Sequence, residues 1–215
     1  MANRFPITKD VAFAEVTTST LTEATGQCWK SCSPPRFGSI VHIDNGASTV
    51  FGIVSEIQTG SLDPTRTPFA YEKTEDELKS EQPQIFNFLT TTFKVSAIGY
   101  ETKRSGIGYA LVPPTPSRVH AFICKTPVAS LFYVLRSSKF MRLIFSNNGI
   151  QVSIDELLLA VATNLAADRI LSPEIIKQIG ESFAYGGADY RRIRQFFVAA
   201  EQMLHPTREK IEREL

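Results

Sequence analysis

The chain has 215 residues, 43% hydrophobic and 21% charged, so it is long enough to bury one large core or two modest ones. Its formal net charge of +1 creates no overall field that would draw it to nucleic acid or to an anionic membrane, so any such binding must be local. No apolar run is long enough for a membrane helix, and residues 1–10 lack the apolar core of a signal peptide. We therefore expect a cytosolic protein without a membrane partner.

The chain up to residue 119 is predicted to be a β domain. Residues 11–30 are rich in threonine and short apolar side chains, a composition that favours twisted strands. Residues 37–43 and 49–57 are β-branched runs on either side of a turn rich in Asp, Asn, Gly and Ser, which predicts a β-hairpin. Each run contains one glycine, expected where a small coiled sheet needs a bulge or a close backbone approach; these glycines are Gly38 and Gly52.

The second half of this domain is predicted to contain a helical insert and further strands. Gly60, Pro64 and Pro68 indicate a loop with little regular structure. Thr74 with Glu77 fits a capping box, which predicts one or two short helices between residues 74 and 89. Residues 92–100 and 106–112 are predicted to pair as strands, for a barrel-sized total of about five to seven.

Four residues rich in proline, 113–116, predict a boundary, after which residues 120–215 form a helical domain. The helix starts expected there carry N-terminal signals; they lie near Pro127, Ser153 and Ser172. The helix from Ser153 to about Ala167 is apolar on nearly every side, so it should lie centrally. The fold class is thus α+β, a small antiparallel barrel with a short helical insert followed by helices.

The last clear helix is predicted to begin after Asp189. An apolar seam along it consists of residues spaced by three or four positions: Tyr190, Ile193, Phe197, Ala200 and Leu204. The charged tail after Arg208 is expected either to extend this helix or to fray.

No motif for a known catalytic chemistry is present. A phosphate-binding loop needs a Gly-Lys pair, which the chain lacks, so we expect neither ATP binding nor hydrolysis, and no cofactor. The three histidines, His42, His120 and His205, have no second ligand at metal-site spacing, so no metal is expected. Cys28 and Cys32 are predicted to be reduced thiols whose role stays open. No catalytic residue is assigned.

Three arginines in the first turns of the last helix, Arg191, Arg192 and Arg194, are unusual because the helix dipole disfavours positive charge there. One interpretation is local pairing with Asp189 or with acidic residues of a neighbouring helix. The other is a patch that faces an anion or an acidic partner. A second candidate patch surrounds the last hairpin of the β domain and consists of Lys103, Arg104 and Arg118.

Several segments carry a likeness to a known family, in the order in which they occur: residues 34–41, 50–57, 62–68, 82–85, 98–100 and 113–122. They resemble the HAS-barrel, the small barrel that precedes the motor domain of HerA-type DNA translocases and is related to the N-terminal barrel of ATP synthase ring subunits. The chain is most similar to stand-alone HAS-barrel proteins. The resemblance implies a role in subunit contacts or in docking a partner, without the motor.

The expected function is therefore that of a non-enzymatic assembly or adaptor module with a protein partner or a second copy of itself. A homo-oligomer is expected, most simply a dimer, because two-fold association is the commonest solution. The alternative is a nucleic-acid-associated accessory factor of a translocase or nuclease, and an uncharacterised enzyme ranks third.

Overall fold

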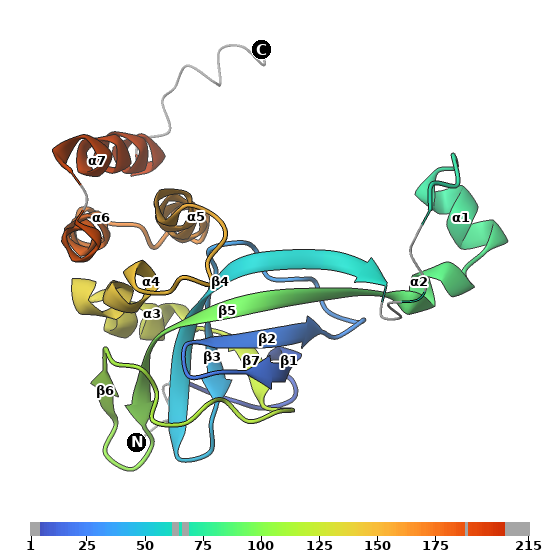
Figure 1. Cartoon of the computed structure of the whole chain (residues 1–215), viewed down its shortest axis with the longest axis horizontal. Coiled ribbons are helices and arrows are strands. Elements are labelled where there is room, and N and C mark those ends of the chain that lie inside the picture. The colour runs from blue at the N-terminus through green and yellow to red at the C-terminus, as the bar shows by residue number, and fades with distance from the viewer. Residues whose placement is uncertain (1–4, 62–64, 66–68, 188, 205–215) are drawn as a thin grey trace.

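The computed structural model describes residues 5–61, 65, 69–187 and 189–204. A β-barrel lies at the centre, helices cover one side of it, and a narrow arm extends from the opposite side (Figure 1). Within the described ranges, no helix is both long and apolar enough to cross a membrane. The charged tail after Arg208, and His205, lie outside the described residues.

The barrel consists of six antiparallel strands, as the sequence predicts: β1 (Ala12–Ser19), β2 (Glu23–Cys28), β3 (Ile40–Asp44), β4 (Ser48–Ser61), β5 (Leu89–Thr102) and β7 (Phe122–Lys125). The strands pair in the order β1-β2-β5-β4-β3-β7, and β7 pairs with β1 to close the barrel. A short additional strand, β6 (Ile107–Tyr109), pairs with the end of β5. Closure removes the unpaired edges that an open sheet would expose.

The interior of the barrel is filled by small and β-branched side chains together with Phe93, which alternate with outward-facing residues along each strand. Gly52 lies where the pairing of β4 with β5 shifts register. A Cβ atom at Gly52 would be 2.3 Å from Cγ1 of Val95, which is closer than two carbons can approach. The bulge and the missing side chain together let β4 curve tightly around the barrel.

Strand β7 lies beyond residue 119, where the sequence predicts the end of the β domain, so the barrel extends to Lys125. Pro113–Pro116 are a connection that leads into this last strand. The four residues of β7 fill the gap between β1 and β3. Such a short apolar run carries no periodicity that would distinguish a strand from a buried helix segment.

The helices after the barrel agree with the predicted starts. They are α3 (Val128–Leu135), α4 (Arg142–Phe145), α5 (Ile154–Ala167), α6 (Pro173–Ser182) and α7 (Tyr190–Leu204), with short 3₁₀ turns at Ser138–Met141 and Phe183–Gly186. The hydroxyl groups of Ser153 and Ser172 cap α5 and α6 by accepting backbone hydrogen bonds.

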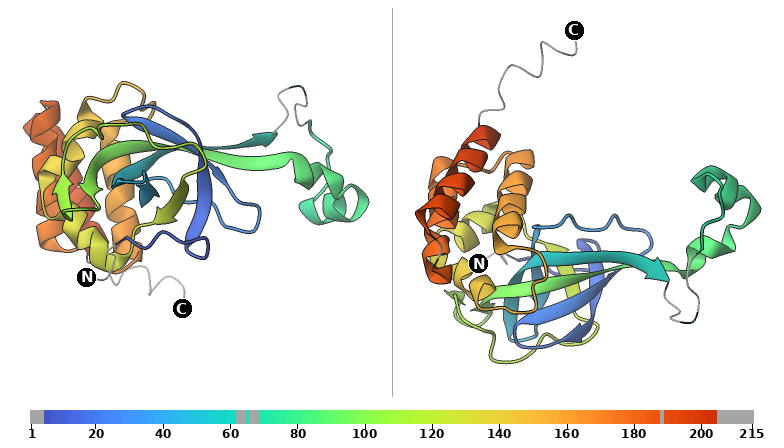
Figure 2. Two further views of the ribbon diagram at one scale, coloured as in Figure 1. Left: turned by 90° about the horizontal axis from the view of Figure 1, so that it is seen from below. Right: turned by 45° about the horizontal axis from the view of Figure 1, so that its top comes forward.

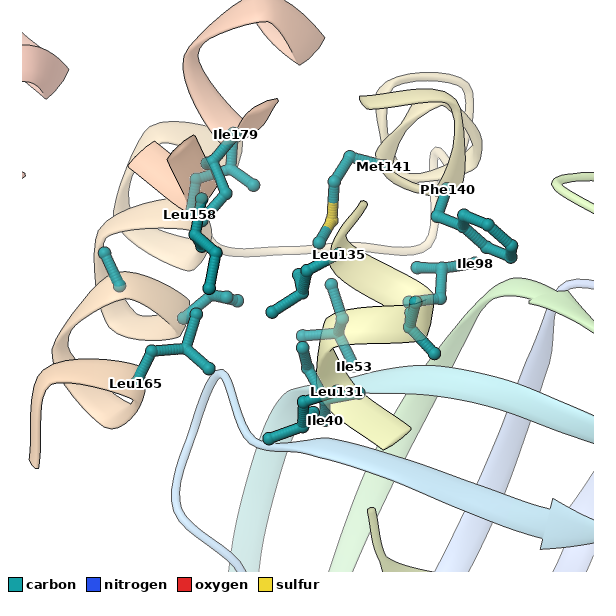
Figure 3. Close-up of a cluster of buried hydrophobic side chains, with 14 of the residues drawn as sticks. Ile40, Ile53, Ile98, Leu131, Leu135, Phe140, Met141, Leu158, Leu165 and Ile179 are labelled. Carbon is teal, nitrogen blue, oxygen red and sulfur yellow. The ribbon is translucent and has the colours of Figure 1, made fainter. Parts of the chain in front are cut away.

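The helices pack onto the outside of the barrel and share one apolar core with it (Figure 3). From the barrel, Ile40, Ile53 and Ile98 point into this core. Helix α5 is central, as its all-round apolar sequence predicts, since Leu157, Leu158, Val161 and Ala162 are fully buried. At Gly38 the φ angle is +79°, and a Cβ there would be 2.7 Å from the backbone of Ala160 in α5. This glycine therefore permits close contact between the start of β3 and α5.

Two local expectations differ from the structure. Gly60 belongs to β4 rather than to a loop, because β4 and β5 remain paired beyond the barrel; Pro64 and Pro68 lie outside the described residues. In α7, Tyr190 is 79% exposed, and Phe196 is buried instead. The rest of the predicted seam is confirmed, since Ala200 is buried in the core and Ile193, Phe197 and Leu204 pack against it.

Candidate functional sites

The arginines of the first predicted basic cluster, on α7, lie in two different environments, one paired and one exposed to solvent. The guanidinium of Arg192 donates to the carboxylate of Asp155 in α5, with Nη2 2.6 Å from Oδ1 and Nε 3.0 Å from Oδ2. The backbone N–H of Arg192 donates to Oδ1 of Asp189 at 2.9 Å. Local pairing therefore explains Arg192. Arg191 and Arg194 are exposed, and no ion pair joins them to another described residue.

The second cluster surrounds Asp44, at the turn between β3 and β4. Nζ of Lys103 is 2.5 Å from Oδ1 of Asp44, and the guanidinium of Arg118 lies beside the same turn. Burial tends to raise the pKa of Asp44, but the hydrogen bond and charge of Lys103, with the charge of Arg118, lower it below its ordinary value. Lys103 is thus partly neutralised, while Arg104 is exposed on the neighbouring turn.

These two clusters do not form one surface. Helix α7 lies at the top of the molecule in Figure 1, and the turns that carry Lys103, Arg104 and Asp44 lie at the bottom. The six predicted residues therefore belong to two separate sites.

The most prominent surface is the arm, which the patterns in the sequence do not indicate. Beyond the barrel, β4 and β5 continue as a two-stranded ribbon in which Thr59 pairs with Thr91, their hydroxyl oxygens 2.9 Å apart. The ribbon carries α1 (Glu75–Glu81) and α2 (Gln84–Phe88) at its end (Figure 2). The capping box of Thr74 and Glu77 is present, as predicted.

The end of the arm has no core of its own. Neither α1 nor α2 contains a buried residue. Phe69 is 68% exposed and Phe88 is 41% exposed, and the ring of Phe69 contacts that of Tyr71 with centroids 4.2 Å apart. Strands β4 and β5 have fourteen residues each, longer than a barrel of this size needs, whereas the β patterns in the sequence cover only residues 49–57 and 92–100 and so do not indicate the arm.

A cleft of about 390 Å³ lies between α5, the start of β3 and the loop around Pro34. An ion pair of 2.9 Å between Lys125 and Asp168 lies in its wall, and the side-chain amide of Asn164 donates to the carbonyl of Phe37 at 2.8 Å. Because these polar groups hold the two walls together, the cleft marks the contact between barrel and helices. Its residues come from distant segments, so no sequence motif marks it.

Among the described histidines and cysteines, His42 and Cys124 are buried in the barrel. His42 is fully buried, with Nε2 3.2 Å from the carbonyl of Pro6 and Nδ1 3.4 Å from the hydroxyl of Thr126. Burial lowers its pKa to about 4, so it is neutral near pH 7. Burial also raises the pKa of Cys124 to about 11. Within the part of the chain that the structure describes, no three His, Cys, Asp or Glu residues are placed to hold a metal ion.

The architecture is thus a six-stranded antiparallel barrel followed by helices, with an arm that projects from the sheet. No family model matches the chain, and no curated protein sequence matches it. The likeness to the HAS-barrel therefore rests on the segments quoted from the sequence and stays a prediction at the level of the family.

Proposed function

We propose that this chain is a non-enzymatic assembly or adaptor module, in which a barrel of the HAS type and its helices form a rigid body and the arm docks on a protein surface. The observation that carries the proposal is the absence of buried residues from both helices of the arm. The arm touches the body at its base, where Nζ of Lys30 donates to the carbonyl of Asn87 at 2.6 Å, and its two helices increase the exposed surface without adding a buried residue to the core.

The short helices and exposed aromatic side chains of the arm favour its use as a docking surface. Helices as short as α1 and α2 are marginal in isolation, and in most proteins tertiary packing of an apolar face stabilises them. Here Phe69 and Phe88 are exposed to solvent, and the other large aliphatic and aromatic side chains of the arm helices are only partly buried. Exposed apolar residues grouped with polar ones are typical of protein interaction sites. A partner that covers them would supply the missing packing.

The proposal includes no nucleotide chemistry, since the chain lacks the Gly-Lys pair of a phosphate-binding loop. Phosphate release from ATP above that of a mock preparation, abolished by a variant that unfolds the barrel, would contradict it.

The test is to use the purified chain as bait and to compare it with a variant in which residues 62–88 are replaced by Asn-Gly. Ser61 pairs with Leu89, so a two-residue turn can join these strands. We expect the chain to bind itself or another protein through the arm, measured by light scattering over a concentration series and by capture followed by mass spectrometry. A strict monomer that captures no protein in an arm-dependent manner would overturn the proposal. Salt-sensitive retention on DNA would favour the alternative of a nucleic-acid-associated factor, because phosphate contacts release counterions.

A further inference from the structure

The end of the arm and helix α7 lie at opposite ends of the long axis of the molecule (Figures 1 and 2). We propose that the end of the arm of one copy docks on the outer face of α7 of a second copy, and that the contact is reciprocated in a two-fold dimer. The inference rests on the proposed function and names the partner and the two surfaces.

The end of the arm is acidic and aromatic. Residues 69–88 contain five acidic and two basic side chains: Glu72, Glu75, Asp76, Glu77 and Glu81 against Lys73 and Lys79. Both lysines are paired within the arm, Lys79 with Glu75 at 2.6 Å and Lys73 with Glu81. Glu72, Asp76 and Phe69 are all exposed, so the end of the arm carries both a net negative charge and an exposed aromatic ring.

The outer face of α7 has the complementary character. Arg191 and Arg194 are exposed, one turn apart, and the described residues offer neither an acidic partner. Two apolar side chains share this face: Tyr190 is 79% exposed and Val198 is 49% exposed. The acidic Glu201 lies two turns beyond Arg194, so the positive charge is concentrated at the start of the helix.

The chemistry of the two surfaces matches. A guanidinium can form a planar pair with a carboxylate and can stack on an aromatic ring, and the end of the arm exposes both groups, in Glu72, Asp76 and Phe69. The contact would also neutralise the arginines at the start of α7, where the helix dipole disfavours positive charge. This would account for Arg191 and Arg194 at that position, since among the described residues Arg192 alone of the three has an ion-pair partner.

The arm points away from the helices of its own chain in Figures 1 and 2, so it does not cover α7 of the same chain, and the complementary charge of the two surfaces favours a second copy as the occupant. Two elongated molecules that lie side by side in opposite directions bring each arm to the α7 of the other. Such an arrangement is closed by a two-fold axis, and each contact occurs twice.

The first test changes α7 alone, in the variant Arg191→Glu with Arg194→Glu. Glutamate in the first turns of a helix interacts favourably with the dipole, so this variant keeps the fold. We expect a dimer for the wild-type chain and a dissociation constant at least about tenfold larger for the variant, measured by sedimentation. The matched control, Lys9→Glu with Arg104→Glu, makes the same change of net charge at exposed sites elsewhere and should dimerise like the wild-type chain.

The second test mixes two variants that each lack one surface. The chain in which Asn-Gly replaces residues 62–88, or alternatively Phe69→Ser, lacks the arm surface, and the double arginine variant lacks the α7 surface. Each should be monomeric alone, and their mixture should form a one-to-one complex, weaker than the wild-type dimer because one contact of two is restored. Adding Glu72→Lys and Asp76→Lys to the arm of the double arginine variant should restore self-association.

The inference would be overturned if both single-surface variants dimerised as fully as the wild-type chain. It would also be overturned if the Lys9 and Arg104 control lost dimerisation. A wild-type chain that stays monomeric at high micromolar concentration would overturn it as well. A monomer that captures a different protein through its arm would leave the proposed function standing, so the two failures are distinguishable.

Discussion

The guanidinium of Arg192 in α7 holds the carboxylate of Asp155 in the first turn of α5 through two hydrogen bonds, of 2.6 and 3.0 Å. Both side chains are partly exposed, so the pair contributes modestly, at about 1 kcal/mol. We expect Arg192→Ala to lower the free energy of unfolding in urea by about this amount and Arg191→Ala to leave it unchanged. Equal effects of the two substitutions would show that the pair with Asp155 does not anchor α7.

The buried imidazole of His42 predicts a stability that depends on pH. Burial lowers its folded-state pKa to about 4 from an ordinary value of 6.5, so the unfolded chain binds a proton that the folded protein does not. Stability is then fully present above pH 6.5 and decreases by about 3 kcal/mol as the pH falls to 4. Urea titrations at several pH values measure this.

The variant His42→Gln should remove this part of the pH dependence, even though its stability is lower throughout. His120→Asn is the matched control, because His120 is exposed and its φ angle of 64° suits asparagine. A wild-type pH profile in the His42 variant would contradict the assignment.

The close packing around Gly52 predicts a large loss of folding stability for any added side chain. Gly52→Val would push a methyl group against Val95 and the backbone of Ser96, so we expect a loss of about 3 kcal/mol or a failure to fold. Gly60, also in β4, has no atom within 4 Å of an added Cβ, so Gly60→Val should stay within about 0.5 kcal/mol of the wild-type chain. Thermal unfolding followed by circular dichroism compares the two, and an unchanged Tm for Gly52→Val would refute the proposed close approach.

Replacing residues 62–88 by Asn-Gly is expected not to lower the stability of the monomer. The helices removed contain no buried residue, and a shorter loop costs less entropy to close. Chemical unfolding at low protein concentration, where association does not contribute, is the measurement. A marked loss of stability would mean that the arm supports the barrel rather than a partner.

The three cysteines should differ in reactivity. Burial raises the pKa of Cys124 to about 11, and burial with the nearby Cys32 raises the pKa of Cys28, so both are protonated near pH 8. Cys32 is only partly buried. We expect iodoacetamide to modify one thiol rapidly in the native protein and all three in urea, as counted by mass spectrometry. Rapid modification that persists in Cys32→Ser would contradict this order.

The sequence by itself determined most of the local structure, because the signals for it are local. Residues close together in the sequence determine the hairpin of β3 and β4, the capping box at Thr74 and the serine caps of α5 and α6. The change from strand to helix periodicity likewise predicted a barrel followed by helices.

Only the tertiary structure decided which distant groups meet. Arg192 pairs with Asp155 on another helix, whereas Arg191 and Arg194 face solvent. This difference arises because α7 is oriented with Phe196 and Ala200 towards the core. The arm likewise depends on how far β4 and β5 stay paired beyond the barrel, and this is a long-range register that neither strand encodes alone. Contacts of this kind depend on packing between elements far apart in the chain, so the sequence indicated the arginines of α7 but the arm became visible only in the folded molecule.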